Sequence, residues 1–230
     1  MLYLQPLFCV KCLNCKSVYY VITRMFSYFV VRRAIRFWTT ETQSGLGESE
    51  VFHVYSLGIV FGVGGSLEEF DPEKWNADSV VALAKAAGMK SIVFTSKHHD
   101  GFCMYHSKYT KYNIVDATPF KRDVMKELSD ACRRQGVKFA VYYSLIDWNF
   151  PGNGITPHNA DAISKEHHAF SMHQVEEIMT NYGPISEIWF DMGSLSGQQS
   201  KELYDLVSRL QPQCMVSGRL GNDRGDFAVM

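Results

Sequence analysis

The feature that most constrains the fold is a regular alternation of short, nearly continuous apolar segments with longer segments of helical periodicity. The apolar segments are residues 55–63, 89–96, 137–144, 185–191 and 214–218. The helical segments are residues 71–88, 121–136, 160–183 and 196–211, and the first three end at a glycine. Apolar strands separated by helices pair in parallel, with helices covering the sheet. The pattern therefore predicts an α/β fold, either a doubly wound sheet or a (β/α)8 barrel.

Two further observations favour the barrel. No glycine-rich phosphate-binding loop follows the first apolar segment, which disfavours the nucleotide-binding form of a doubly wound sheet. Several apolar segments end in polar or aromatic clusters, and barrel enzymes build their active sites at the carboxyl ends of strands. A complete barrel takes roughly 250 residues, whereas about five βα units fit within residues 51–230. We therefore predict an α/β fold with an incomplete (β/α)8 TIM-barrel-like catalytic domain.

Residues 1–50 differ from the rest of the chain. They are rich in aromatic and β-branched residues without a clear period, and residues 39–50 have the composition of a linker. We expect an unassigned N-terminal segment over residues 1–50 and a partial barrel over residues 51–230. The C-x-x-C-x-x-C motif at residues 9–15 has no fourth ligand nearby, so we predict no metal site there. The start also lacks a basic segment before an apolar core, so no secretory signal is predicted.

The net charge and the apolar content limit the kinds of partner that the chain can have. The net charge is −1, which gives no general attraction to nucleic acid or to acidic membranes. The apolar content of 46% and the charged content of 20% are ordinary for a globular protein. The most apolar stretch, residues 17–31, is interrupted by Arg24 and falls short of the ~20 residues that a membrane-spanning helix needs. We therefore predict neither a nucleic-acid partner nor a membrane span.

Carboxylate and aromatic residues at two strand ends are candidates for a sugar site. Because side chains alternate along a strand, Trp189 and Asp191 share one face, and so do Tyr142 and Ser144. An indole can stack on the apolar C–H groups of a sugar while a neighbouring carboxylate attacks or stabilises the anomeric carbon. The alternatives are that Asp191 caps the following helix and that Tyr142 is a buried tyrosine with a satisfied hydroxyl.

Histidines follow the second apolar segment. His98 and His99 lie where a strand curls into a loop, so both can reach a ligand, either as hydrogen-bond donors to hydroxyls or through one of them as a metal ligand. A second group, His167, His168 and His173, lies in a helical segment. We interpret that second group as mostly surface residues without a role.

The motifs F-D-P-E-K-W, K-H-H-D-G-F, K-R-D, Y-Y-S and W-F-D, in this order and spacing, resemble the α-L-fucosidases of glycoside hydrolase family 29. The resemblance covers residues 70–230 and implies a barrel enzyme that removes α-linked L-fucose with net retention, through a covalent glycosyl–aspartate intermediate. It implies that Asp191 is the nucleophile, with Asp100 bracing the turn or a histidine. The implied sugar-contacting residues are His98, His99, Tyr142, Trp189 and Arg219.

The resemblance also implies a fucosylated glycan as the substrate and no metal or organic cofactor. Members of the family are commonly lysosomal, secreted or periplasmic. Neither the compartment nor the oligomeric state of this chain follows from its sequence.

Three departures from the family pattern change the expectation for activity. The opening strand of the family carries a sugar-binding histidine where this sequence has Gly62, and a segment with a sugar-contacting Glu-Trp pair is missing after Gly65. The acid/base glutamate of the family lies just beyond the position of Met230, so it is not present in this chain. We therefore expect a truncated fucosidase that is weakly active or inactive.

Two other interpretations stay open. The same residues could bind fucose without cleaving it, which would make the chain a non-catalytic fucose-binding protein. His98, His99 and Asp191 could also serve a metal-dependent hydrolase.

Overall fold

The computed structural model describes residues 51–54 (backbone only), 67, 70–152, 158 and 160–228. The apolar segment at residues 55–63, the cysteine motif at residues 9–15 and the predicted N-terminal segment, residues 1–50, lie outside the described residues.

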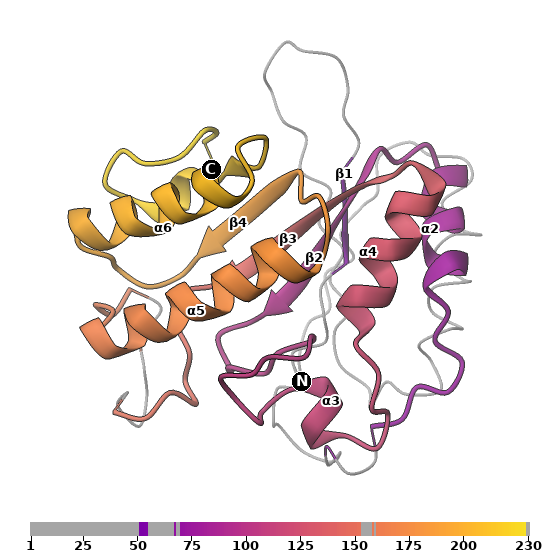
Figure 1. The fold of residues 1–230 in the computed structure, drawn as a ribbon, viewed down its shortest axis with the longest axis horizontal. Helices are drawn as coiled ribbons and strands as arrows, with labels where there is room; N and C mark the ends of the chain where they lie inside the picture. The colour runs from indigo at the N-terminus through magenta and orange to yellow at the C-terminus, as the bar shows by residue number, and fades with distance from the viewer. Residues whose placement is uncertain (1–50, 55–66, 68–69, 153–157, 159, 229–230) are drawn as a thin grey trace, which may run out of the picture.

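A parallel sheet forms the centre of the described structure (Figure 1). Its strands are β1 (Val51–Val54), β2 (Ser91–Lys97), β3 (Lys138–Ser144), β4 (Glu187–Asp191) and β5 (Met215–Val216). They are paired in the order β1-β2-β3-β4-β5, and every neighbouring pair is parallel. A doubly wound sheet reverses its strand order part-way, whereas successive strands of a barrel wall are neighbours. The predicted fold class, α/β with barrel-like βα units, is therefore confirmed.

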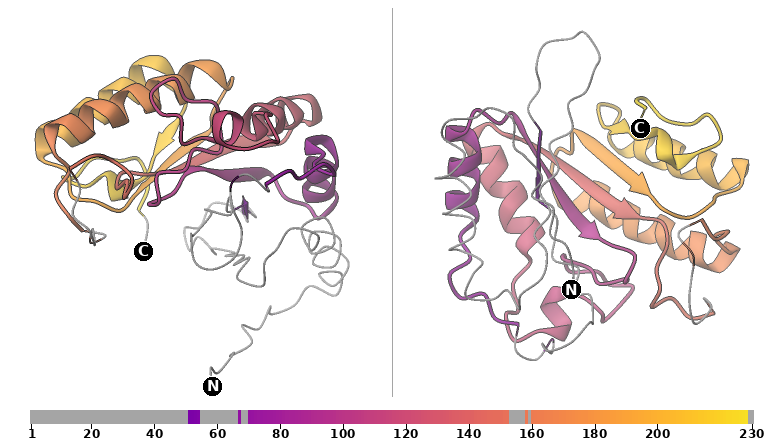
Figure 2. Two further views of the ribbon diagram at one scale, coloured as in Figure 1. Left: turned by 90° about the horizontal axis from the view of Figure 1, so that it is seen from below. Right: turned by 180° about the vertical axis from the view of Figure 1, so that it is seen from behind.

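Helices cover one face of this sheet. The helices of the described residues are α2 (Ala77–Ala86), α3 (Ile114–Ala117), α4 (Val124–Gln135), α5 (Lys165–Asn181), α6 (Gly197–Leu210) and the short 3₁₀ helix η2 (Gly218–Leu220). Figure 2 shows α4, α5 and α6 on the same side of the strands, and α2 packs beside α4. No helix in the described part of the chain is both long enough and apolar enough to cross a membrane.

The helix ends follow local capping, which corrects three of the predicted starts. The first helical segment was predicted to begin at residue 71, but α2 begins at Ala77, and Asn76 is its cap, accepting a 2.8 Å hydrogen bond from the Ser79 backbone N–H. Residues 71–75 form a turn instead, closed by the Trp75 N–H on the Pro72 carbonyl. Helices α4 and α5 likewise start later than predicted, after their caps Asp123 and Ser164. In all three helices the start is set by the residue whose side chain accepts a hydrogen bond from a first-turn N–H group.

The two faces of the sheet carry different residues. Alternate residues of the strands, such as Phe94, Val141 and Phe190, pack under the helices in the main apolar core. The opposite face, which we call the inner face, carries a smaller cluster of Val93, Ala140, Tyr142 and the partly buried Trp189.

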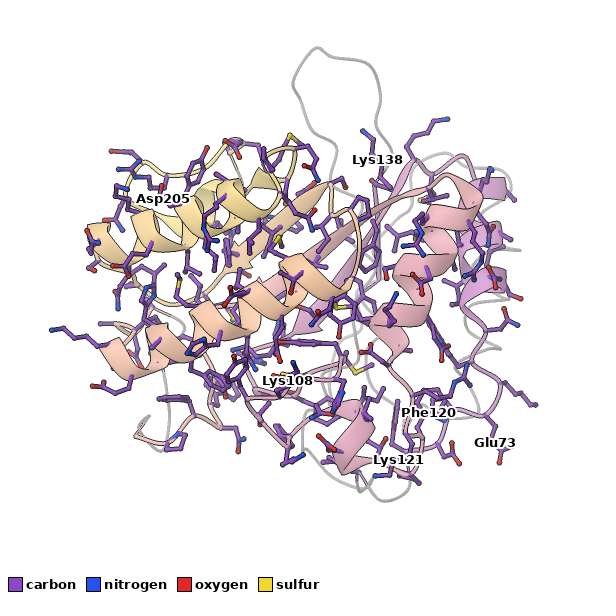
Figure 3. All side chains as sticks on the ribbon, viewed as in Figure 1. Glu73, Lys108, Phe120, Lys121, Lys138 and Asp205 are labelled. Carbon is purple, nitrogen blue, oxygen red and sulfur yellow. The ribbon has the colours of Figure 1, made fainter. Side chains whose placement is uncertain are left out.

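All strands of the sheet point the same way, and long loops follow β2 and β3 at their carboxyl ends. In Figure 3, Lys138 marks the amino end of β3 and Lys108 marks the loop that follows β2. The carboxyl end is where parallel α/β proteins collect their functional side chains.

Candidate active site at the carboxyl end of the sheet

Asp191 is the last residue of β4 and sits at the centre of the candidate site. Pairing of β3 with β4 sets Tyr142 opposite Trp189 and Ser144 opposite Asp191. These residues share the inner face, whereas Phe190 packs in the main core. The predicted alternation of Trp189 and Asp191 on one face is therefore confirmed.

Two hydrogen bonds hold the carboxylate of Asp191. The Tyr142 hydroxyl donates to Oδ2 at 2.9 Å, and the Arg219 guanidinium donates to Oδ1 at 2.7 Å. The Arg219 and Asp191 side chains are 46% and 22% exposed, so this ion pair meets solvent. The alternative that Asp191 caps the next helix is wrong, because Ser196 caps α6 in a capping box with Gln199. The alternative for Tyr142, a buried tyrosine with a hydrogen-bonded hydroxyl, is also met. The acceptor of that hydrogen bond is the carboxylate of Asp191, so the residue is part of the site.

His98 and His99 lie next to Tyr142, directly after β2. The His98 ring stacks on the Tyr142 ring with centroids 5.6 Å apart, and the two histidines face each other through their Nδ1 atoms at 2.5 Å. Burial, with a smaller effect from His99, lowers the pKa of His98 to about 4. The imidazole is therefore neutral near pH 7, and one Nδ1–H of the pair donates to the other Nδ1.

The turn after the histidines is built by Asp100 and Gly101. Asp100 accepts a 3.1 Å hydrogen bond from the Phe102 N–H, so it braces the turn rather than a histidine. Burial raises the pKa of this carboxyl to about 6. Gly101 has a φ of +82°, and a Cβ there would lie 2.1 Å from the Asp147 Oδ1 atom. Only glycine fits at that position without displacing a buried carboxylate.

A buried ion pair beneath the histidines was missed from the sequence. Lys97 and Asp147 have side chains 0% and 5% exposed, with Nζ 3.5 Å from Oδ2, and Nζ also lies 4.4 Å from the centre of the Tyr143 ring. Burial alone would lower the pKa of Lys97, but Tyr143 and Asp147 outweigh it and raise the pKa, so the ammonium stays charged. The available signal was a lysine that ends an apolar strand one residue before the histidine pair.

A β-bulge explains why Lys97 and His98 point where they do. The register of β2 on β3 shifts between Thr95 and Lys97, so that Thr95 pairs with Tyr142 and Lys97 with the next residue, Tyr143. Simple alternation would place Lys97 on the inner face with Thr95. The bulge turns Lys97 under the helices instead and leaves His98 to stack on Tyr142.

His167 and His168 are buried, which corrects the prediction that they lie mostly on the surface, whereas His173 is exposed. His167 and His168 are 1% and 6% exposed. The His167 ring stacks on Phe150 at 4.5 Å, and His168 Nε2 lies 2.8 Å from a carboxylate oxygen of Glu202 in α6. Burial lowers the pKa of His167 to about 4. The periodicity of α5 does not predict this burial, because both histidines lie on polar faces of the helix. Those faces are covered by α6 and by the loop after β3.

Metal-ligating side chains do not gather in the described part of the chain: no group of three or more His, Cys, Asp or Glu residues there is placed to hold a metal ion. The cysteines of this part, Cys103, Cys132 and Cys214, are buried free thiols.

Comparison with known proteins assigns the chain to a family. The family model described as "Alpha-L-fucosidase" matches residues 26–228. The chain belongs to the α-L-fucosidase family. The match begins well before residue 70, where the resemblance of the motifs starts, and so includes residues that the motifs left unassigned.

Individual relatives agree with the family assignment. The chain is 32% identical over 162 residues to α-L-fucosidase 1 of Arabidopsis thaliana, covering 67% of this chain and 30% of that protein. It is 35% identical over 156 residues to human plasma α-L-fucosidase, covering 65% of this chain and 27% of that protein. The chain thus spans less than a third of the length of these curated relatives.

Solved structures show the same likeness in three dimensions. An α-L-fucosidase from Lactobacillus casei, solved in complex with its α-L-fucose product, superposes with a TM-score of 0.64 at 42% identity, covering 70% of this chain and 57% of that one. Isoenzyme 1 from Paenibacillus thiaminolyticus gives a TM-score of 0.62 at 32% identity, with 70% and 44% coverage.

Proposed function

We propose that this chain carries the fucose-binding part of a retaining α-L-fucosidase site, with Asp191 as the nucleophile. The observation that carries the proposal is the carboxylate of Asp191, held between Tyr142 and Arg219 on the inner face at the carboxyl end of the sheet. A fixed, partly exposed carboxylate beside aromatic rings is what attack on an anomeric carbon requires.

The proposed reaction has two steps. In the first, a carboxylate oxygen of Asp191 bonds to the anomeric carbon of fucose, while the bond to the glycosidic oxygen breaks and the leaving group keeps the electron pair. In the second, water attacks the same carbon and loses a proton, and the ester to Asp191 breaks. Two inversions release L-fucose with its original anomeric configuration.

Neighbouring side chains support the binding of a sugar. The neutral His98 and His99 rings offer N–H donors and N acceptors to hydroxyl groups. Trp189 lies on the same face as Asp191 and offers an aromatic surface to the apolar face of a pyranose. Arg219 donates to Oδ1 of Asp191, so it must move or share this contact when that oxygen attacks.

The substrate class follows from the family. The Lactobacillus casei enzyme was also solved, as variants, with 4-nitrophenyl α-L-fucopyranoside and with Fucα(1,6)GlcNAc. We therefore propose terminal α-L-fucose on an oligosaccharide or glycoconjugate as the substrate. General acid assistance to the leaving group is worth roughly 10²–10⁴-fold in glycosidases and similar enzymes, and no described residue is assigned that role.

The aryl fucoside is the sharpest probe, because 4-nitrophenolate departs without a proton. Wild-type protein should release it and give α-configured L-fucose as the first product, seen by proton NMR. Asp191→Asn should reduce the release by at least about 10³-fold, as expected for loss of a nucleophile. β-Configured L-fucose as the first product, or full activity in Asp191→Asn, would contradict the proposal.

A matched control lies on the same strand. Glu187 is on the same face of β4 as Asp191 but at the amino end of the strand, and burial raises the pKa of its carboxyl to about 7. Glu187→Gln should therefore leave hydrolysis within about twofold of wild type, a change too small for a group that touches the reacting atoms.

A second candidate is fucose binding without turnover. It is favoured by the engagement of both carboxylate oxygens of Asp191, since attack requires one of those bonds to weaken. Calorimetric titration with L-fucose separates the two functions: saturable binding without release of 4-nitrophenolate supports a binding protein, and both together support the enzyme.

A further inference from the structure

Trp148 is an exposed aromatic residue beside the site that the proposed reaction does not use. It follows β3 on the same loop as Asp147, and it is 42% exposed. Resting on the fucosidase function proposed above, we propose that Trp148, packed on His99, forms a platform for the pyranose ring to which the fucose is attached.

The rings at this edge form a series that runs from a buried floor to an exposed rim. Tyr142, whose hydroxyl donates a hydrogen bond to Asp191, is 8% exposed, and the His98 ring stacks on the Tyr142 ring. His99 packs edge-on against His98 with centroids 4.0 Å apart. The Trp148 ring follows at 3.9 Å from the His99 ring.

This order of burial matches the geometry of cleaving a terminal sugar. The terminal fucose must reach the carboxylate on the floor, whereas the remainder of the glycan stays outside. The sugar next to fucose therefore meets the rim of the site, where Trp148 lies. An indole offers a broad apolar face to the C–H groups of a pyranose, so the fitting ligand is a pyranose ring with an apolar face.

The Trp148 loop is fixed in place. The Trp148 N–H donates to the His99 carbonyl at 2.7 Å, which ties the loop to the histidine turn. The preceding residue, Asp147, is anchored by Lys97 and accepts a 2.8 Å hydrogen bond from the Asn149 N–H. A large aromatic side chain held half-exposed by buried anchors loses little conformational freedom when a ligand stacks on it.

Binding of two ligands to the intact chain tests the platform. One ligand is L-fucose, and the other is the fucosyl-N-acetylglucosamine disaccharide with sulfur in place of the glycosidic oxygen, which resists cleavage. Wild type should bind the disaccharide more tightly than fucose. Trp148→Ala should weaken disaccharide binding about 3- to 10-fold, the range for one aromatic stacking contact, and leave fucose binding within about twofold.

Two variants serve as controls. Trp148→Phe keeps an aromatic face and should retain most of the preference for the disaccharide. Tyr109 is similarly exposed, at 45%, and stacks on His173 instead, so Tyr109→Ala should change neither affinity. Urea unfolding of each variant checks that it is folded.

The outcomes separate this inference from the function on which it rests. Equal weakening of both ligands by Trp148→Ala, or no effect on either, would overturn the platform while the fucosidase site stands. Failure of wild type to bind L-fucose at all would overturn the proposed function, and the platform with it.

Discussion

Two ion pairs at the carboxyl end of the sheet each join an aspartate to a basic side chain, but one is buried and the other meets solvent. Lys97 and Asp147 join the ends of β2 and β3 with side chains 0% and 5% exposed. Arg219 and Asp191 join the ends of β5 and β4 with side chains 46% and 22% exposed. The difference shows that burial decides whether such a pair can be broken at little cost when a ligand binds.

The physical reason is desolvation. A buried pair has no water to replace a lost partner, so removing one residue leaves the other charge buried and uncompensated. Such a pair therefore holds its two loops together permanently. A solvent-exposed pair exchanges with water at little cost. Asp191 can therefore change partners when a ligand arrives, whereas Asp147 cannot.

Breaking the buried pair should have the largest effect. Lys97→Met removes the ammonium but keeps a similar length, leaving the Asp147 carboxylate buried without its cation. We expect the free energy of unfolding to fall by about 3–5 kcal/mol, measured by urea denaturation followed by circular dichroism.

The double variant Lys97→Met/Asp147→Leu is the matched control. Because it removes both charges, it should recover much of the stability that the single variant loses. If the two substitutions add without coupling, the pair is not the fastening described here.

A second comparison contrasts Asp191 with the partly buried Glu187 on the same strand. Burial raises the pKa of Glu187 to about 7 from 4.5, so between these values the folded state holds a proton that the unfolded state has lost. The stability associated with the neutral carboxyl is present below pH 4.5 and is lost as the pH rises through about 7.

Glu187→Gln removes this titration. Relative to wild type, the variant should gain up to about 3 kcal/mol of stability between pH 4 and pH 8, measured by urea unfolding at both pH values. A difference between variant and wild type that stays constant with pH would show that Glu187 is solvated in the folded protein.

The exposed pair should give the smallest effect on stability. Arg219→Gln breaks the contact with Asp191, yet the free energy of unfolding should change by only about 0–1 kcal/mol. The same variant should weaken binding of L-fucose, since Asp191 loses one of its two fixed partners. A loss of several kcal/mol would mean that this pair, too, is a structural fastening.

Much of the architecture could be predicted from the sequence. The apolar segments became β2 to β5 because strands buried on both faces need continuous apolar residues, and the glycine after α4 ended it with a φ of +71° at Gly136. Alternation along β4 placed Trp189 and Asp191 on one face, and the structure brings the five predicted site residues around Asp191 or its strand neighbours, as follows: His98, His99, Tyr142, Trp189 and Arg219.

The remainder depended on contacts distant in sequence. The bulge at Thr95 breaks the alternation that the prediction relied on, so Lys97 turned into the core and found Asp147, 50 residues away in a loop. His167 and His168 are buried by α6 and by Phe150, which no periodicity of α5 reveals. Local patterns set the strands and helices, whereas partners across loops set the burial of charged groups.

The central claim, that the carboxylate of Asp191 is the nucleophile, is tested most directly by chemical rescue with azide. Asp191→Ala leaves space where the carboxylate attacks, so azide should restore release of 4-nitrophenolate and give β-L-fucosyl azide, the product of a single inversion. Asp147→Asn, which disturbs the buried pair, should not respond to azide. Azide without effect on Asp191→Ala, in a protein whose wild type cleaves the aryl fucoside, would contradict the account.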